Sequence, residues 1–391
     1  MSSLSRRDSR AAAPLMMMAG VMATLLVGNL LSSLSPMYIG SLMEHLHLTE
    51  SDAGLVMTVE LIAAAASLTV FSRRLVAFPP FRLAAVGTAV VVTAQLASAF
   101  APHLPTLLCV RALSGIGASF ALLAASILIS RRPDPDRYIA IAMVGTTLVF
   151  TAIMGICGIA IARYGLLGFY MVAAGSAVLV LPLFIAIDSR AYASDSPASH
   201  STPLPPTILS SRGATIVAFV IAIIGLTFIG QAAWSFAQRS GTNAGIAGPE
   251  IAGWLAGSNL LTVLGAMVAV WVSSRVTSVV PLLVGVLATG LTCAMQIGAE
   301  SSLAFEFPVL LNGFAFGFST PFVFGTGARI DRSGTVVAYL NSAVLFTQAA
   351  TPLFAGELIE YGSYQSLGIV LGVGTVLATA LIVPACLMAR E

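Results

Sequence analysis

A succession of long apolar stretches constrains the fold of this chain more than any other feature of its sequence. Each stretch is about 18 residues or longer, enough to cross the hydrocarbon core of a bilayer as an α-helix. Only 9% of the 391 residues are charged. Soluble domains carry roughly 25%, so the composition excludes a water-soluble globule. We place twelve membrane-spanning helices near residues 15–39, 53–72, 83–101, 104–130, 138–162, 166–187, 214–236, 250–273, 279–299, 307–327, 335–356 and 365–388.

The arginines are distributed unequally between alternate loops, and the chain contains no lysine. If the N-terminus is cytoplasmic, fifteen of the 18 arginines face the cytoplasm, Arg163 and Arg239 face outside, and Arg111 lies within a span. This asymmetry follows the positive-inside rule. The first apolar run is too long for a signal peptide, so it is expected to remain as the first helix. We therefore expect a multi-pass protein of a cell membrane, most simply a bacterial inner membrane, with both termini cytoplasmic.

One polar interruption divides the chain into two similar parts. It contains four prolines and seven serines, a composition typical of a flexible linker. The fifth and eleventh spans end alike, in Ile161-Ala-Arg-Tyr-Gly165 and Ile359-Glu-Tyr-Gly362. Repeats of this kind build transporters, with the solute site between the repeats. We expect a cytoplasmic tail over 1–14, a six-helix bundle over 15–187, a cytoplasmic linker over 188–213 and a pseudo-symmetric six-helix bundle over 214–391.

Two passages carry a family resemblance. Residues 46–54 read Leu-His-Leu-Thr-Glu-Ser-Asp-Ala-Gly, and residues 111–119 read Arg-Ala-Leu-Ser-Gly-Ile-Gly-Ala-Ser. With the six-plus-six layout, they resemble the major facilitator superfamily (MFS), whose fourth helix carries Arg-x-x-x-Gly-x-Gly-x-Gly, over essentially the whole chain. The resemblance implies a secondary transporter whose helices 1, 4, 7 and 10 line a central cavity. The loop over 72–82 lacks the aspartate usual in the family, and the fifth span lacks the Gly-Pro pair of drug/proton antiporters.

Two ionisable residues inside the spans are the candidates for proton coupling, since a charge at membrane depth is costly unless it serves a function. Glu60 and Arg111 each lie seven residues into their spans from the outer end. At 1.5 Å per residue, both lie roughly 10 Å below the same surface. A nearby arginine holds a buried carboxylate ionised, and its withdrawal lets the carboxylate take a proton. We expect the two residues to pair and to couple proton to solute. A static ion pair that fixes the two helices is the alternative.

Polar residues on the spans that the resemblance places around the cavity are candidate solute contacts. The alternative for each is interhelical hydrogen bonding, or for the tryptophan an anchor at the membrane interface. The candidates are Asn29, Arg111, Gln231, Trp234, Asn259, Asn312, Asn341 and Gln348. The four cysteines all fall within predicted spans and lack the spacing of a zinc site or a disulfide framework. We expect no metal, no cofactor and no enzymatic activity.

The sequence thus predicts an all-α polytopic membrane protein of the MFS fold that moves a small organic solute by alternating access, with protons as the coupling ion. Arg111 favours an organic anion, and the mostly apolar walls favour an amphipathic or aromatic compound. Drug/proton antiport, as in multidrug efflux, is the alternative, and a non-transporting receptor or scaffold is a third possibility. The expected partners are the solute, protons and the lipid bilayer, without nucleic acid, and we expect a monomer.

Overall fold

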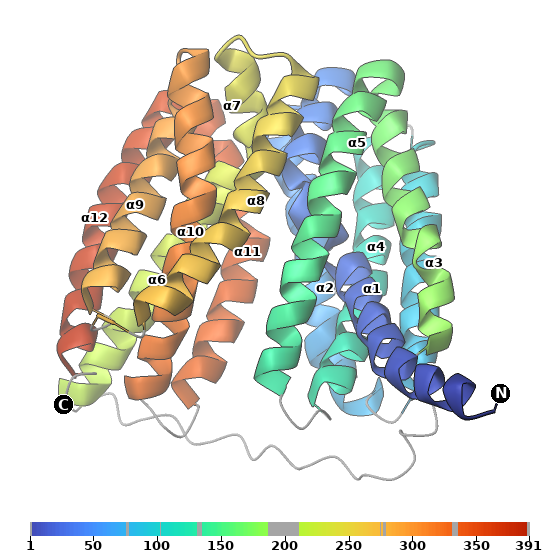
Figure 1. Ribbon diagram of the computed structural model, residues 1–391. Coiled ribbons are helices and arrows are strands. Elements are labelled where there is room, and N and C mark those ends of the chain that lie inside the picture. The colour runs from blue at the N-terminus through green and yellow to red at the C-terminus, as the bar shows by residue number, and fades with distance from the viewer. Residues whose placement is uncertain are drawn as a thin grey trace. The chain divides into compact units, whose positions relative to one another are not determined.

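The computed structural model describes residues 2–75, 78–101, 103–130, 135–186, 211–273, 275–276, 279–330 and 335–388, and no residue in these ranges belongs to a β-strand (Figure 1). The helices are α1 (Ser2–His45), α2 (Glu50–Leu75), α3 (Pro80–Ser98), α4 (Leu104–Ser130), α5 (Pro135–Leu179), the short 3-10 helix η1 (Leu181–Ala186), α6 (Ser211–Ser235), α7 (Ala237–Asn243), α8 (Gly248–Ser273), α9 (Val279–Ile297), α10 (Ser302–Ile330), α11 (Thr335–Tyr361) and α12 (Tyr364–Met388). The predicted fold class, an all-α polytopic membrane protein, is confirmed.

Ten helical stretches among the described residues are long and apolar enough to cross a membrane. The number differs from the twelve predicted spans for two reasons. The stretch Ile141–Phe184 is 44 residues long and holds both the fifth and the sixth predicted spans. The helix α11, which matches the eleventh predicted span, is not among the ten. The remaining nine stretches each match one predicted span.

Gly165 separates the fifth and sixth spans within α5. Its dihedral angles are φ 60° and ψ −145°, a combination outside the helical region that is essentially restricted to glycine. Residues eight apart are about 12 Å apart along a straight helix. Here a Cβ added to Gly168 would overlap the carbonyl oxygen of Ala160, which shows that the chain reverses at Gly165. The segments on either side of Gly165 therefore form a tight helical hairpin.

The helix that matches the seventh predicted span, α6, ends as expected near residue 236, and a second short helix follows it. At Phe236 the backbone leaves the helical geometry (φ −101°, ψ 8°), and the chain resumes as α7. Ser240 on α7 donates hydrogen bonds to the carbonyl oxygens of Gln296 (2.6 Å) and Ile297 (3.0 Å). These carbonyls end α9 and have no partner within that helix. The hydroxyl of Ser240 thus fixes α7 to the end of α9.

The helices form two compact units. The first comprises Met1–Leu34 and Val59–Ala198, and the second comprises Ser35–Thr58 and Ser199–Glu391. The helices α1 and α2 therefore contribute to both units, and their ends nearest the connecting loop belong to the second. Most of the predicted linker over 188–213 lies outside the described residues.

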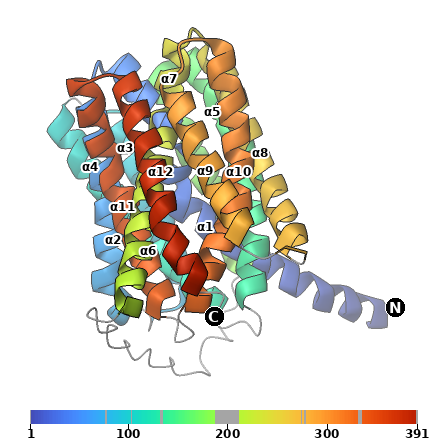
Figure 2. The ribbon, with the colours of Figure 1, turned by 90° about the vertical axis from the view of Figure 1, so that its left-hand side faces the viewer.

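Each unit has its own packing. In the first, α3 packs against α4 and α5; in the second, α10 packs against α8 and α9, and α12 lies beside α6 and α9 (Figure 2). The core between these last helices contains Phe219, Leu282, Ile382 and Ala385, all fully buried.

Large apolar side chains remain on the outer surface of the helices, as expected where lipid replaces water. On α8, Leu264, Met267 and Val270 are 47%, 65% and 69% exposed. At the end of the same helix, the guanidinium carbon of Arg275 lies 3.9 Å from the centre of the Trp271 ring. Tryptophan and arginine together are typical of the membrane–water interface. These surfaces belong to a multi-pass membrane protein.

Candidate functional site

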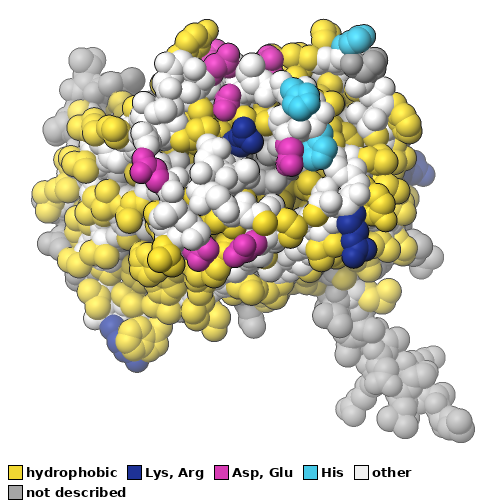
Figure 3. All heavy atoms as spheres, turned by 90° about the horizontal axis from the view of Figure 1, so that it is seen from above, with side chains coloured by type: hydrophobic (Ala, Val, Ile, Leu, Met, Phe, Trp, Pro, Cys, Tyr) yellow, Lys and Arg dark blue, Asp and Glu magenta, His cyan; other side chains and the backbone are white. Residues whose placement is uncertain are grey.

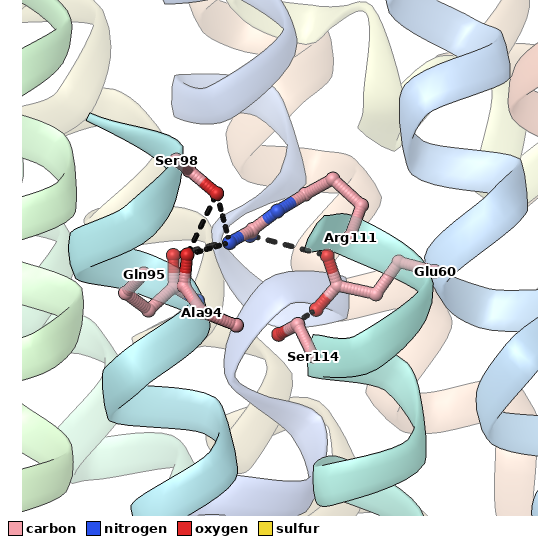
Figure 4. Close-up of polar contacts among 6 residues, drawn as sticks. All are labelled: Glu60, Ala94, Gln95, Ser98, Arg111 and Ser114. Carbon is pink, nitrogen blue, oxygen red and sulfur yellow. Dashed lines mark hydrogen bonds and ion pairs between the residues drawn. The ribbon is translucent and has the colours of Figure 1, made fainter. Parts of the chain in front are cut away.

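A buried ion pair joins α2 to α4 in the first unit. The Nη1 atom of Arg111 lies 3.2 Å from Oε2 of Glu60 (Figure 4). The arginine is 0% exposed and the glutamate 4%. The pairing predicted from the depth of the two residues is confirmed, whereas their role in transport stays a prediction.

The guanidinium is also held by α3. Its Nη1 donates to Oε1 of Gln95 (3.1 Å). Its Nη2 donates to the carbonyl oxygen of Ala94 (3.0 Å) and to Oγ of Ser98 (2.6 Å). Figure 4 shows Arg111 between these acceptors and the carboxylate of Glu60. Both terminal nitrogens are therefore engaged by protein acceptors.

Two further contacts complete the arrangement. Ser114, one turn along α4 from Arg111, donates to Oε1 of Glu60 at 2.7 Å. The guanidinium carbon of Arg111 lies 5.7 Å from the ring centre of Tyr170 on α5, within the range of a cation–π contact. The charges are thus satisfied by groups from four helices of one unit.

A glycine allows the two charged helices to approach. A Cβ added to Gly115 would overlap the carbonyl oxygen of Glu60, so the backbones of α4 and α2 are in contact there. Small residues at such crossings are typical of helix packing in membranes. This close approach brings the side chain of Arg111, four residues earlier on α4, within reach of the carboxylate.

Sequence reasoning missed Gln95, Ser98 and Ser114 as members of this site. All three are uncharged and lie in otherwise apolar spans, so nothing marked them as partners of a charge. A signal was nevertheless present, because Gln95 and Ser98 are three residues apart, as are Arg111 and Ser114. Residues at this spacing share one face of a helix.

The candidate solute contacts are divided between the units: Asn29 and Arg111 belong to the first, and the other six belong to the second. Asn29, in the first unit, donates to the carbonyl oxygen of Leu25 on its own helix (2.9 Å). In the second unit, Nε2 of the buried Gln231 donates to Oγ of Ser235 (3.1 Å). The side chains of Trp234, Asn259 and Gln348 are half-buried. The side chain of Asn341 lies outside the described residues.

Asn312 has a structural role in this conformation. Its Nδ2 contacts three acceptors on α9: the carbonyl oxygen of Thr289 (3.0 Å), Oγ1 of Thr292 (3.1 Å) and Sγ of Cys293 (3.0 Å). The amide therefore joins α10 to α9, as the interhelical alternative predicted, and its solute contact stays a prediction.

A second polar arrangement lies where α2 meets α11 in the second unit. The backbone N–H of Ser51, in the first turn of α2, donates to Oε2 of Glu360 (3.3 Å). A carboxylate at a helix N-terminus is electrostatically favourable. Further along, the N–H of Leu353 donates to Oγ1 of Thr58 (3.1 Å), beside the helix irregularity that Pro352 imposes.

The same two helices meet backbone to backbone. A Cβ at Gly54 would overlap the carbonyl oxygen of Pro352, and a Cβ at Gly356 would overlap that of Glu50. Glycines on both helices thus let this part of α2 lie directly against α11. Thr58, at the end of this contact, is two residues from Glu60.

Apolar membrane-length helices in two units, with an ion pair buried inside one of them, define a polytopic helical membrane protein. The chain matches the family model of the Major Facilitator Superfamily over residues 17–343 and belongs to that family. The protein is accordingly an MFS transporter and not an enzyme.

Solved structures with the same fold include transporters of different solutes. A mutant of the nucleoside transporter NupG superposes with a TM-score of 0.75 at 12% sequence identity, covering 94% of this chain and 99% of that chain. A peptide transporter POT in complex with sulfate gives a TM-score of 0.73 at 14% identity, with 96% and 95% covered. A bacterial homologue of the human lysosomal transporter Spinster gives 0.65 at 15% identity, with 97% of each chain covered. At these identities the likeness concerns the fold. No curated protein sequence matches the chain significantly.

Proposed function

We propose that this transporter moves a small organic solute by alternating access and couples the movement to protons through Glu60 and Arg111. The observation that carries the proposal is the ion pair itself: a 0% exposed arginine and a 4% exposed glutamate inside membrane-spanning helices. Ionisable residues at such positions are rare and usually serve ion or proton movement.

The contacts of Glu60 suggest how it would exchange a proton. Arg111 and Ser114 donate to its two oxygens, which favours the ionised carboxylate. If Glu60 on α2 moved away from α4, the carboxylate would lose the donors Arg111 and Ser114 and would take up a proton. The arginine would keep its three contacts with α3.

The position of Glu60 along α2 supports such a movement. Residues up to Thr58 belong to the second unit and contact α11, whereas Glu60 contacts α4 in the first unit. A rearrangement of α11 would therefore displace α2 at Thr58, two residues before Glu60. This is the physical basis on which we link the conformational cycle to protonation.

The proposed solute is a small organic compound with amphipathic or aromatic character. Arg111 was a candidate anion ligand, but four protein acceptors occupy its terminal nitrogens in this conformation. Direct contact with an anionic solute would require that network to open. Gln231, Trp234 and Asn259 would then supply the solute contacts, with the indole ring favouring an aromatic group.

Membrane location and orientation form part of the proposal. We place the protein in a bacterial inner membrane with both termini in the cytoplasm, because fifteen arginines then face inside. Figure 3 shows Asp and Glu side chains gathered on the face seen from above, which would be the outer face. In the proposed topology, the acidic residues of the second unit at outer helix ends and loops are Glu44, Glu50, Asp52, Glu250, Glu300, Glu306, Glu357 and Glu360.

The experiment has two stages. Purified protein is screened by thermal shift against nucleosides, short peptides and aromatic carboxylates, since a ligand that binds the folded state raises its stability by mass action. The stabilising compound is then measured in proteoliposomes, both for uptake driven by a pH gradient and for exchange without a gradient. Glu60→Gln is compared with Glu250→Gln, which changes an exposed carboxylate.

We expect Glu60→Gln to abolish gradient-driven accumulation and to retain exchange, while Glu250→Gln behaves as the wild type. The sign of the pH gradient that drives accumulation distinguishes symport from drug/proton antiport. A folded Glu60→Gln variant that still accumulates solute with an unchanged pH profile would show that the ion pair is static.

A further inference from the structure

A small cavity lies beside the ion pair in the first unit. Its volume is about 20 Å³, and α1, α2, α3 and α4 all contribute to its walls. Most of the lining is apolar, but Glu60, Gln95, Ser114 and Ser32 also reach it. A single water molecule needs about 10–15 Å³ measured in this way, together with two to four polar partners. The cavity therefore has room for one water molecule and the groups to bind it.

The orientation of Gln95 shows which of its atoms serves the cavity. Arg111 only donates hydrogen bonds, so the atom of Gln95 that it contacts must be the oxygen Oε1. The amide nitrogen Nε2 is then the other branch of a side chain that is 1% exposed and lines the cavity. The hydrogen bond from Arg111 to Gln95 engages Oε1 and leaves both N–H groups of Nε2 available as donors. An amide N–H group at the wall of a cavity with room for water is expected to donate to a water molecule there.

Glu60 provides the complementary group. Its two carboxylate oxygens offer about four lone pairs, of which the hydrogen bonds from Arg111 and Ser114 use two. A water molecule can accept from Nε2 of Gln95 and donate to Glu60 at the same time. A metal cation cannot satisfy the amide, because the N–H groups of Gln95 and the nearby guanidinium would repel it. A donor and an acceptor that both line the cavity therefore favour water as its occupant.

We propose that one water molecule occupies this cavity and that Glu60 exchanges its proton through this water. The proton would reach the water from the wall of the cavity that α1 forms, where Ser32 lies (the α1 side). This inference rests on the proposed proton coupling and adds the route. When Glu60 is released from Arg111, the cavity water gives one proton to a carboxylate oxygen. It receives one from a hydronium ion on the α1 side. One O–H bond breaks and one forms at the cavity water, so the water is regenerated and the carboxylate becomes neutral.

The test fills the cavity without touching its polar groups. Val91 is 2% exposed and lines the cavity, so Val91→Ile adds one methyl group to its wall. Val86, on the same helix, is 52% exposed, and Val86→Ile is the matched control. In lipid nanodiscs, the carbonyl stretch of protonated Glu60 is followed by infrared difference spectroscopy after a downward pH step and is identified by its loss in Glu60→Gln.

We expect the band to appear at least about tenfold more slowly in Val91→Ile, and at the wild-type rate in Val86→Ile. An unchanged rate in a folded Val91→Ile would overturn the route. A wild-type protein without any Glu60-dependent band would instead refute the proton coupling. A structure at a resolution that shows ordered waters decides the water site separately: density within hydrogen-bond distance of Gln95 Nε2 supports it, and an empty cavity refutes it.

Discussion

Removing the arginine of the buried pair is the most direct perturbation of this protein. In Arg111→Met the apolar stem is roughly preserved, but the four hydrogen bonds from the terminal nitrogens are lost. At roughly 0.6 kcal/mol each, as measured between membrane helices, these bonds alone contribute about 2.4 kcal/mol. The change also leaves the carboxylate of Glu60 buried without its countercharge. Breaking a buried pair from one side costs about 3–5 kcal/mol, so we expect a loss within that range.

The assay is equilibrium unfolding by SDS in mixed micelles, followed by circular dichroism. Arg163→Met, which changes an exposed arginine, is the control and should unfold like the wild type. In the double variant Glu60→Met/Arg111→Met neither charge is left unpaired, so its loss should be smaller than the sum of the two single losses by about 1–3 kcal/mol. If Arg111→Met is as stable as Arg163→Met, or if the two losses at the pair simply add, the charges do not stabilise one another and our argument fails.

Three further experiments, with four substitutions in all, test other parts of the structure. Gly54→Val would force a side chain into the carbonyl of Pro352, and we expect overpacking to cost about 1–3 kcal/mol in the same assay; an unchanged stability would mean that α2 and α11 do not meet there. Ser240→Ala removes the hydroxyl that contacts the end of α9 and should lower the free energy of unfolding by about 1 kcal/mol, while a neutral result would contradict its role. In a cysteine-free background, we expect Asn243→Cys to react with an impermeant maleimide on intact cells and Arg275→Cys to react only after lysis; the reverse pattern would invert the proposed topology.

Part of the site could be predicted because depth follows from sequence position. Glu60 and Arg111 lie equally far along spans that cross the membrane in the same direction, and a rise of 1.5 Å per residue places them at one level. Gln95, Ser98 and Ser114 could not be found in the same way. Their contribution depends on how α3 and α4 are rotated about their axes, and apolar spans that face lipid on one side and protein on the other carry little periodicity to reveal that rotation.

The sequence by itself determined the class of this protein. Its scarcity of charge, the length of its apolar stretches and the placement of its arginines require membrane-spanning helices, because a backbone in hydrocarbon must satisfy its own hydrogen bonds. Only the tertiary structure decided which faces meet. It assigned residues 35–58 to the second unit, joined Asn312 to α9 and surrounded Arg111 with acceptors from α2 and α3. The reason is that hydropathy reports transfer from water to lipid, whereas partner choice between helices depends on close packing and on directional hydrogen bonds.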